Sequence, residues 1–309
     1  MTKVSVVIPC YKFDTTLCQR AIKSILQQSL SDIELLIIDD SPNDNTEFFS
    51  EFEDNRIKYI HNYPRIGLAT SKNQGMKFAT CDYIAFMDVD DYSYPERLQK
   101  QYQFLLKHPD VDICGTWFKA GQNNIKHPTD NKDISFGMLF SHCCLGMPTI
   151  MLRKTSLVKL SMEFPSLSSI EDYDLWLSLL GKAQFANIPE ILFDYNLNEN
   201  SLSTQKGLLI SQSSSASRER KQKELLGFSI EWTQKEEFTT ADWALFSQER
   251  KLIQKHFGST DFSEKFFAHM QRNIIRRTVR NYDFYKELWK ENIPFLFKLK
   301  QFFKRRKVK

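Results

Sequence analysis

The chain has 309 residues, a formal net charge of +4, and a composition that is 41% hydrophobic and 26% charged. This composition is typical of globular proteins with one large or two smaller domains, and it excludes fibrous and disordered chains. The six cysteines form no CxxC pair, so we expect reduced thiols in a cytoplasmic protein. We expect neither a signal peptide nor a membrane-spanning helix, because no apolar run approaches about 18 residues.

Short apolar runs alternate with segments of helical periodicity over the first hundred residues. Strands are predicted at 4–8, 33–38, 57–60 and 83–87, and helices at 13–28, 45–52 and 67–79. The strands begin about 24–29 residues apart, which is typical of right-handed βαβ units and predicts an α/β fold with a mostly parallel sheet. Ligands bind beyond the carboxyl ends of such strands, and acidic residues stand at two of these ends.

The later sequence is less regular. Helices are predicted at 96–107 and 170–180, a strand at 111–118, and a strand-like segment at 143–152. Residues 1–205 contain 19 Lys+Arg and 26 Asp+Glu, a net charge of −7, whereas residues 206–309 contain 23 and 12, a net charge of +11. We therefore predict a domain at 1–205 and a helical, basic C-terminal region at 206–309, each with its own partners.

Asp88-Val89-Asp90-Asp91 follows the fourth predicted strand. Residues two apart in an extended chain share a face, so Asp88 and Asp90 can point the same way. Three carboxylates in four residues repel one another unless a cation or hydrogen bonds offset their charge. Their hard oxygen atoms suit Mg²⁺ or Mn²⁺. The alternative is a solvated acidic turn at the start of the next helix.

Two further polar segments have both a structural and a functional interpretation. Asp39-Asp40-Ser41 can accept hydrogen bonds from a base or a ribose, or only from its own turn. In the segment 168–176, Ser169 can cap a helix whose dipole favours acids in its first turn. Alternatively, one of these acids is a general base. The candidates are Glu171, Asp172 and Asp174.

Five segments, in order, resemble motifs of glycosyltransferase family 2. Together they cover about residues 3–200, which makes the resemblance far more specific than any single motif. The segments are VSVVIPCYK at 4–12, IIDDSPNDNT at 37–46, GLATSKNQG at 67–75, YIAFMDVDD at 83–91 and EDYDLW at 171–176.

The resemblance implies a GT-A fold, a Rossmann-like and mostly parallel sheet flanked by helices, and inverting transfer from a nucleotide-sugar. It further implies that Pro9, Tyr11 and Asp40 hold the nucleobase, usually uracil, and that Lys72 lies near the base or diphosphate. Asp88 would face the ribose or the metal. Asp90 and Asp91 would hold Mn²⁺ or Mg²⁺ at the diphosphate, and Asp172 would be the catalytic base.

The residues agree with these implied roles on chemical grounds. A divalent cation neutralises the charge that grows on a leaving diphosphate. An acceptor hydroxyl becomes a good nucleophile once a carboxylate takes its proton. A base opposite the leaving group must come from a different segment than the metal ligands, as Asp172 does.

The chain also departs from the family pattern. Lys12 replaces the usual Asn, Lys72 replaces Arg and so makes a point-charge contact, and Asn198 stands where many members have His. His142, Cys143 and Cys144 precede Met147-Pro148-Thr149, where family members often place acceptor-site residues. These three could form a metal site, and the alternative is buried packing.

The last twelve residues contain seven Lys or Arg and no acid, with Phe and Leu interleaved upstream and among them. This pattern is typical of an element on an anionic membrane surface, and the alternative is a solvated tail. No nucleic-acid module accompanies the charge, so we expect no nucleic-acid partner. We predict a peripheral enzyme on the inner face of the cytoplasmic membrane.

The sequence therefore predicts a metal-dependent transferase that moves a sugar from a UDP-sugar to a glycan or lipid-linked oligosaccharide in bacterial surface polysaccharide synthesis. A catalytically inactive glycan-binding or scaffold protein is one alternative, which the intact acids disfavour. A sugar nucleotidyltransferase is another. The first predicted loop has no glycine, which disfavours a nucleotidyltransferase and, with GxGxxG absent, a dinucleotide oxidoreductase.

Overall fold

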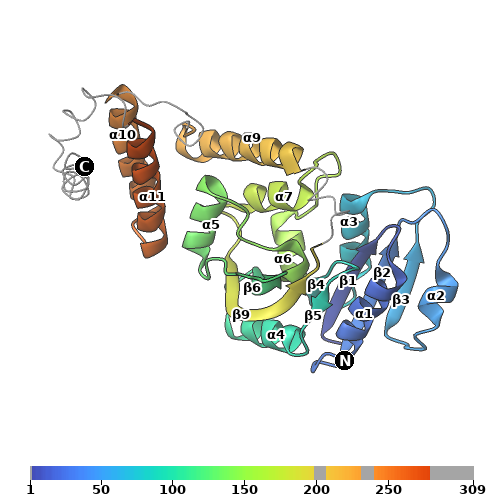
Figure 1. Ribbon diagram of the computed structural model, residues 1–309. Coiled ribbons are helices and arrows are strands. Elements are labelled where there is room, and N and C mark those ends of the chain that lie inside the picture. The colour runs from blue at the N-terminus through green and yellow to red at the C-terminus, as the bar shows by residue number, and fades with distance from the viewer. Residues whose placement is uncertain (1, 198–206, 231–239, 279–309) are drawn as a thin grey trace, which may run out of the picture. The chain divides into compact units, whose positions relative to one another are not determined.

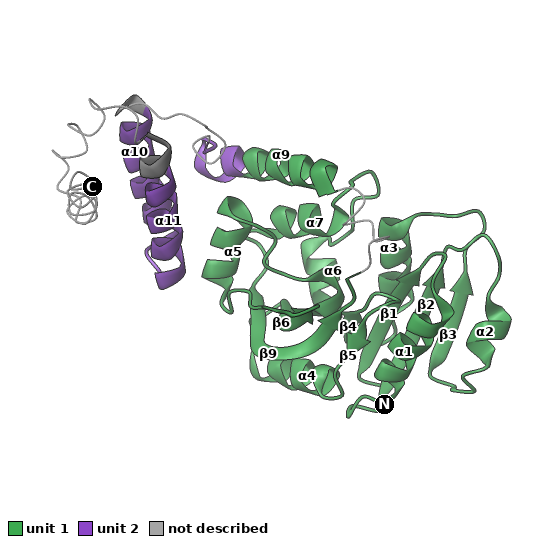
Figure 2. Ribbon diagram, in the orientation of Figure 1, with its two compact units in different colours: residues 1–221 green, residues 222–309 purple. Residues whose placement is uncertain are grey.

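The computed structural model describes residues 2–197, 207–230 and 240–278 (Figure 1). The chain divides into two compact units, Met1–Lys221 and Gln222–Lys309 (Figure 2). Helix α9 (Gly207–Leu226) runs through this division. The boundary predicted after residue 205, Asn198 and the basic end at 294–309 lie outside the described residues.

One nine-stranded sheet forms the centre of the first unit, in the order β3-β2-β1-β4-β8-β6-β9-β5, with β7 paired to β6. Pairing shows that β1, β2, β3, β4, β6 and β9 all run in one direction, whereas β8 is inverted between β4 and β6. The sheet is thus mostly parallel, as predicted. The strands are β1 (Val4–Cys10), β2 (Ile33–Asp39), β3 (Ile57–His61), β4 (Tyr83–Phe86), β5 (Tyr92–Ser93), β6 (Ile113–Ala120), β7 (Asn123–Ile125), β8 (Met151–Arg153) and β9 (Phe185–Tyr195).

Helices cover both faces of this sheet (Figure 1). The buried cluster on one face joins alternate residues of β1 and β2 to apolar side chains of α1, α2 and α4. On the other face α3 packs against β1 and β2. The helices of the first unit are α1 (Thr15–Leu26), α2 (Thr46–Ser50), α3 (Leu68–Phe78), α4 (Arg97–Lys107), α5 (Asn131–Phe140), α6 (Lys154–Leu160) and α7 (Glu171–Leu179), with a 3₁₀ turn at Met147–Thr149.

Strand β1 continues through Pro9 to Cys10, two residues beyond the predicted end at Ile8. Pro9 has no N–H to donate, which excludes proline from the middle of a fully paired strand. Here β4 pairs with β1 only from Val4 to Val7, so the far side of Pro9 faces no strand. The strand can therefore extend along β2 alone and deliver its end to the edge of the sheet.

Gly75 shows why the third motif ends in glycine. A Cβ atom at this position would lie 2.3 Å from Cγ1 of Val7, which is far inside van der Waals contact. The absence of a side chain lets α3 approach β1 closely. The C-terminal half of α3, a helix that carries motif residues, is thereby fixed against the sheet.

Several elements of the first unit were not predicted, namely α5, α6 and the strands β5, β7 and β9. The second unit includes α10 (Thr240–Phe257) and α11 (Asp261–Thr278), in agreement with the predicted helical region. Trp243, Phe246 and Phe267 are buried there, and Arg250 forms an ion pair with Glu264 at 2.7 Å. No helix among the described residues has the length and apolar character needed to cross a membrane.

Candidate active site

Three chain segments meet at the carboxyl edge of the sheet, because β2, β1 and β4 are neighbours that run in parallel. Adjacent strands lie about 4.8 Å apart, so β2 and β4, on either side of β1, are about 10 Å apart across the sheet. The segment after β1 is tied to the segment after β2. The backbone N–H of Asp40 donates to the carbonyl of Cys10 (2.9 Å), and that of Lys12 donates to Oγ of Ser41 (3.0 Å).

Lys12 adopts a left-handed backbone conformation, with φ of 49°. Asparagine tolerates this conformation better than most residues, which explains the Asn that the family motif usually has here. Lys12 keeps the turn despite the substitution, because its N–H is held by Ser41. The first loop therefore closes on the second.

The two acids at the end of β2, Asp39 within the strand and Asp40 directly after it, are buried and have separate structural partners. The Asp39 carboxylate accepts hydrogen bonds from Ser41 N (2.8 Å), Asn45 Nδ2 (2.7 Å) and Tyr59 OH (2.9 Å). The Asp40 carboxylate accepts from Asn62 Nδ2 (2.9 Å) and from the backbone N–H of Gly67 (2.7 Å). Gly67 precedes α3, so Asp40 fixes the start of the helix that carries Lys72.

Tyr11 is exposed at this edge, and its ring is covered by a cation that the sequence interpretation missed. The Arg65 guanidinium lies 4.0 Å from the centre of the Tyr11 ring. This distance is typical of a cation–π contact. Arg65 precedes the third motif by two residues, and no spacing in the sequence indicated the pair.

Lys72 extends from α3 into a buried ion pair with a residue of α7. Its Nζ lies 2.9 Å from Oε1 of Glu171 and 5.2 Å from the centre of the Phe164 ring. Burial alone would lower the pKa of this ammonium, but the charges of Glu171, Asp172 and Asp88 outweigh it and leave the pKa raised. Lys72 therefore stays charged and joins α3, α7 and the acidic turn.

Helix α7 begins differently from the prediction, which placed Ser169 at its cap. Ile170 takes the N-cap position instead, without a side-chain capping hydrogen bond. In the preceding loop, Oγ of Ser168 accepts from the N–H of Ile170 (3.0 Å) and donates to Oδ2 of Asp174. The Ser169 hydroxyl points elsewhere and donates to Ser213. Asp174 is thus part of the helix start, whereas Glu171 and Asp172 face Lys72.

Asp88 and Asp172 lie in one electrostatic environment although 84 positions separate them in the chain. The pKa of Asp88 is raised to about 6, chiefly by burial; Lys72 opposes this shift, and the charges of Asp90, Asp172 and Glu171 add to it. Burial also raises the pKa of Asp172, again opposed by Lys72 and assisted by Glu171. The structure therefore brings Lys72, Asp88 and Asp172 together.

Asp90 and Asp91 have different surroundings. Burial raises the pKa of Asp90, although the side chain of Asn196 and the charge of Arg20 lower it in part. Asp91 is fully buried, and its Oδ1 accepts from the backbone N–H of Asn196 (2.8 Å). Burial and the charge of Asp88 raise the pKa of Asp91 to about 9. Asp90 is thus the more accessible of the two predicted metal ligands.

A divalent cation suits the donor atoms of this turn. Hard carboxylate oxygens at a strand end are the ligands that Mg²⁺ and Mn²⁺ prefer. The raised pKa values of Asp88 and Asp90 show that nearby groups leave their negative charge poorly compensated. Asp91 Oδ2 is a buried oxygen without a hydrogen-bond partner. The turn therefore holds a further unpaired acceptor atom next to Asp90. Asp88 and Asp90 could therefore hold such an ion.

The sequence predicted only some of the residues that surround Lys72 and Asp172. Burial raises the pKa of the Cys143 thiol, and the charge of Asp172 nearby raises it further. Phe164, which lies against Lys72, also contacts Phe86 of β4 and Trp176 of α7. Such contacts arise from tertiary packing, and the sequence carries no local signal for them.

Comparison with known proteins connects this arrangement to an enzyme class. The family model described as Glycosyl transferase family 2 matches residues 5–148. The UDP-Glc:alpha-D-GlcNAc-diphosphoundecaprenol beta-1,3-glucosyltransferase WfgD of Escherichia coli is 34% identical over 66% of this chain and 80% of its own length. The O-antigen biosynthesis glycosyltransferase WbnJ of Escherichia coli is 32% identical over 67% of this chain and 83% of its own length.

Solved structures agree with the fold. The crystal structure of S. aureus TarS 1-349 in complex with UDP-GlcNAc aligns with a TM-score of 0.56 at 16% identity, over 89% of each chain. The fold and the acidic edge of its sheet thus define a glycosyltransferase enzyme with the GT-A fold. The chain belongs to glycosyltransferase family 2.

The Lys72–Glu171 pair predicts a pH-dependent loss of stability in Lys72→Met. Removing one partner of a buried ion pair lowers the free energy of unfolding by about 3 kcal/mol. Native Asp88 already has a pKa near 6, above the usual 3.8, so its charge destabilises the fold as pH rises from about 4 through 6. In Lys72→Met the ammonium that partly offsets the charge of Asp88 is missing, so this pH-dependent destabilisation becomes larger. Urea unfolding should show a larger loss at pH 7.5 than at pH 5.

Lys100→Met is the matched control, because Lys100 forms ion pairs with Glu96 and Glu190 at the surface. It should leave the urea midpoint nearly unchanged at both pH values. Equal stability of Lys72→Met and the parent protein at pH 7.5 would contradict the role given to the buried pair.

Proposed function

We propose that this glycosyltransferase moves a sugar from a UDP-sugar to a lipid-linked glycan, with inversion at the anomeric carbon and with Mn²⁺ or Mg²⁺ at the diphosphate. One observation carries the proposal. Lys72, Asp88 and Asp172, from three separate motifs, act on one another electrostatically at the carboxyl edge of the sheet. This edge is where ligands bind in open α/β sheets.

The donor is proposed to bind along the ends of β1 and β2. Pro9 and Tyr11 would lie against the base, and Asp40 would accept from it with the lone pairs that Asn62 and Gly67 leave free. Arg65, stacked on Tyr11, would place a positive charge beside this end of the donor. The UDP and UDP-GlcNAc complexes of TarS support a uridine nucleotide.

Asp172 is proposed to accept the proton of the acceptor hydroxyl. A general base works best when its pKa lies near the working pH, and burial raises the pKa of Asp172 from its usual value. Lys72 keeps the carboxylate ionised before the reaction, and the Glu171 contact holds Lys72 in place. In-line displacement by the hydroxyl needs no nucleophile from the protein, and the anomeric carbon inverts.

Asp88 and Asp90 are proposed to hold the divalent cation, which when bound supplies positive charge to the leaving diphosphate. Asp91 would join them only after its carboxyl turns away from Asn196. In the conformation described, Asp91 instead ties the acidic turn to the end of β9. The positive charge of Lys72 acts on Asp88, and therefore lies beside the acidic turn at 88–91.

The acceptor is proposed to be a glycan on a polyprenyl diphosphate, in the synthesis of a surface polysaccharide. WfgD, by its name, acts on a GlcNAc-diphosphoundecaprenol, and WbnJ is named for O-antigen biosynthesis. A lipid-linked acceptor requires the enzyme to work at a membrane surface. The basic residues at 298–309 are proposed to supply that attachment.

The acids of α7 give the sharpest test of the reaction. Asp172→Asn should lower transfer from a UDP-sugar to a GlcNAc-diphosphate lipid by about 10²–10⁴-fold, because the amide cannot accept the proton. UDP affinity should stay within about threefold of the parent value. Radiolabelled transfer and calorimetric UDP titration measure the two quantities.

Asp174→Asn is the matched control on the same helix turn. Its carboxylate accepts from Ser168, so the change should affect the helix start rather than the rate of transfer. Wild-type transfer by Asp172→Asn would overturn the base assignment. Absence of both UDP binding and transfer across a donor panel would instead favour a glycan-binding protein without activity.

Metal dependence is tested at the acidic turn. Asp90→Ala should weaken UDP binding at least about tenfold in the presence of Mn²⁺ and leave the weaker binding in EDTA almost unchanged, since a cation held by Asp90 would supply positive charge to the diphosphate. Calorimetry with and without Mn²⁺ gives both values. If Asp90→Ala lowers affinity equally in Mn²⁺ and in EDTA, the residue does not act through a metal.

Attachment to membranes is tested by changing Lys304, Arg305, Arg306 and Lys307 together to Gln. Flotation with phosphatidylglycerol vesicles should fall strongly, because each basic residue near an anionic surface contributes about 1 kcal/mol. Transfer to a short water-soluble acceptor should be unchanged. The proposal fails if binding to anionic vesicles persists, or if the parent protein binds neutral vesicles equally well.

A further inference from the structure

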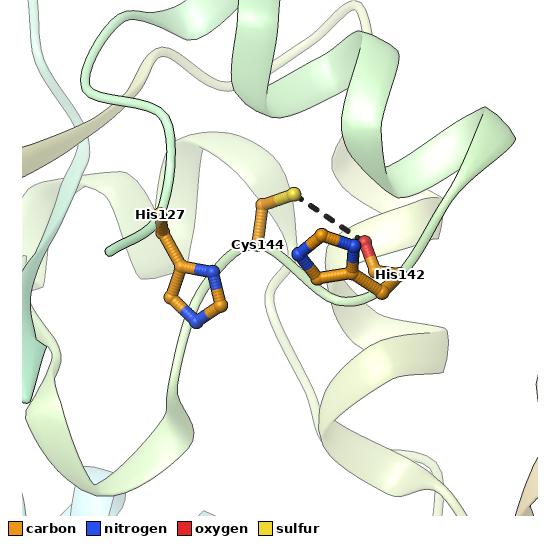
Figure 3. Close-up of side chains that lie close together, drawn as sticks. All are labelled: His127, His142 and Cys144. Carbon is orange, nitrogen blue, oxygen red and sulfur yellow. Dashed lines mark hydrogen bonds between the residues drawn. The ribbon is translucent and has the colours of Figure 1, made fainter. Parts of the chain in front are cut away.

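A second cluster of metal-ligating side chains lies apart from the acidic turn. His127, His142 and Cys144 each offer one ligand atom, and these three atoms all lie within 4.8 Å of one another. Figure 3 shows a ring nitrogen of each histidine and the sulfur of Cys144 turned toward a common space. The sequence interpretation had grouped His142 with Cys143 and Cys144, and the fold replaces Cys143 by His127.

The donor set suits one ion in particular. Two imidazole nitrogens and a thiolate are ligands that Zn²⁺ binds, at about 2.0–2.1 Å and 2.3 Å. Around a tetrahedral zinc such atoms are about 3.4–3.6 Å apart, so a shift of about 1 Å would close the cluster. Mg²⁺ and Mn²⁺ prefer oxygen ligands. The cluster is therefore chemically distinct from Asp88 and Asp90.

The two histidines are prepared to act as ligands. His127 is 8% exposed, and neither of its ring nitrogens has a hydrogen-bond partner among the described residues. Burial and the nearby His142 lower the pKa of His127 to about 4, so the ring is neutral at pH 7. The side chain is thus largely buried while its ring nitrogens remain available to a ligand.

One ring nitrogen of His142 has a hydrogen-bond partner, and the other is available to a metal ion. Its Nδ1 lies 2.8 Å from the Ser141 hydroxyl, which leaves Nε2 for a ligand. Partners of this kind orient metal-bound imidazoles in many sites. Burial of the ring and the charge of Arg218 lower the pKa of His142. The residue as a whole is nevertheless exposed to solvent. An exposed ligand gives an ion a path from solvent.

Cys144 completes the set from the buried side. It is fully buried, and its thiol donates to the carbonyl of His142 at 3.4 Å. Burial raises the pKa of this thiol to about 12, so it carries its proton when no ion is bound. A bound Zn²⁺ would displace that proton to solvent and take the sulfur as thiolate.

We propose that His127, His142 and Cys144 form a Zn²⁺ site, with solvent in the fourth position. His127 lies before α5 and the other two ligands follow it, so the ion would join the two ends of that helix. Cys143 lies beside Cys144 in the chain and near Asp172 in space. The ion would thereby fix the loop that forms one wall of the catalytic site.

Zinc binding to the full-length protein tests the proposal. After EDTA treatment and dialysis, the protein should bind one Zn²⁺ per chain, measured by metal analysis and by competition with a chromophoric chelator. Cys144→Ser and His142→Gln should each weaken binding by at least about tenfold. Co²⁺ in place of Zn²⁺ should give a thiolate charge-transfer band that Cys144→Ser abolishes.

Two variants control for nearby groups. Cys143→Ser removes the adjacent thiol, and Asp90→Asn removes a carboxylate of the acidic turn. Both should retain Zn²⁺ affinity within about threefold. His142 is exposed, so His142→Gln should fold normally, and circular dichroism in EDTA checks this.

Two results would overturn the zinc site. One is the absence of bound Zn²⁺ at micromolar concentrations of free metal. The other is binding that survives Cys144→Ser and His142→Gln but is lost in Cys143→Ser or Asp90→Asn. Neither result depends on donor or acceptor, so a failure here is distinguishable from a failure of the proposed transfer reaction.

Discussion

The contact between Lys72 and Glu171 is the interaction on which the arrangement of the site depends. A buried ammonium and a nearly buried carboxylate, 2.9 Å apart, join α3 to α7 across 99 positions of sequence. Such a pair does not guarantee stability, because desolvation opposes the attraction. The Lys72–Glu171 pair also affects the other acids of the site, since the Lys72 ammonium faces Asp88 and Asp172. Without it, these carboxylates would repel one another or take up protons.

Asp40 helps to position that ion pair, because it holds the start of the helix that carries Lys72. Its carboxylate holds the N–H of Gly67, which precedes α3, and Gly75 lets the same helix lie close on β1. Lys72 stands between these two glycines on one helix. The position of its ammonium is thus determined by backbone contacts at both ends of α3 rather than by side-chain packing alone. Residues that resemble binding motifs serve here also as the framework of the site.

The sequence predicted the first four strands and a mostly parallel sheet, because buried β-branched runs and their spacing depend on local chemistry. It could not predict that Ile170 rather than Ser169 takes the N-cap position of α7, since the conformation of the preceding loop decides where the helix begins. Asp91 also looked equivalent to Asp90 in the sequence. Only the approach of β9, which brings the N–H of Asn196 to Asp91, separates a buried carboxyl from an accessible one.

The loop after α5 shows how one short segment can serve two environments. Cys143 and Cys144 are neighbours in the chain, and their side chains lie in different surroundings. Cys144 thus lies with the two histidines, while Cys143 lies near Asp172 and donates to the carbonyl of Leu145. Anything that fixes one cysteine constrains the other. A change at the histidine side would therefore act first on Cys143, whose thiol lies within the electrostatic influence of Asp172.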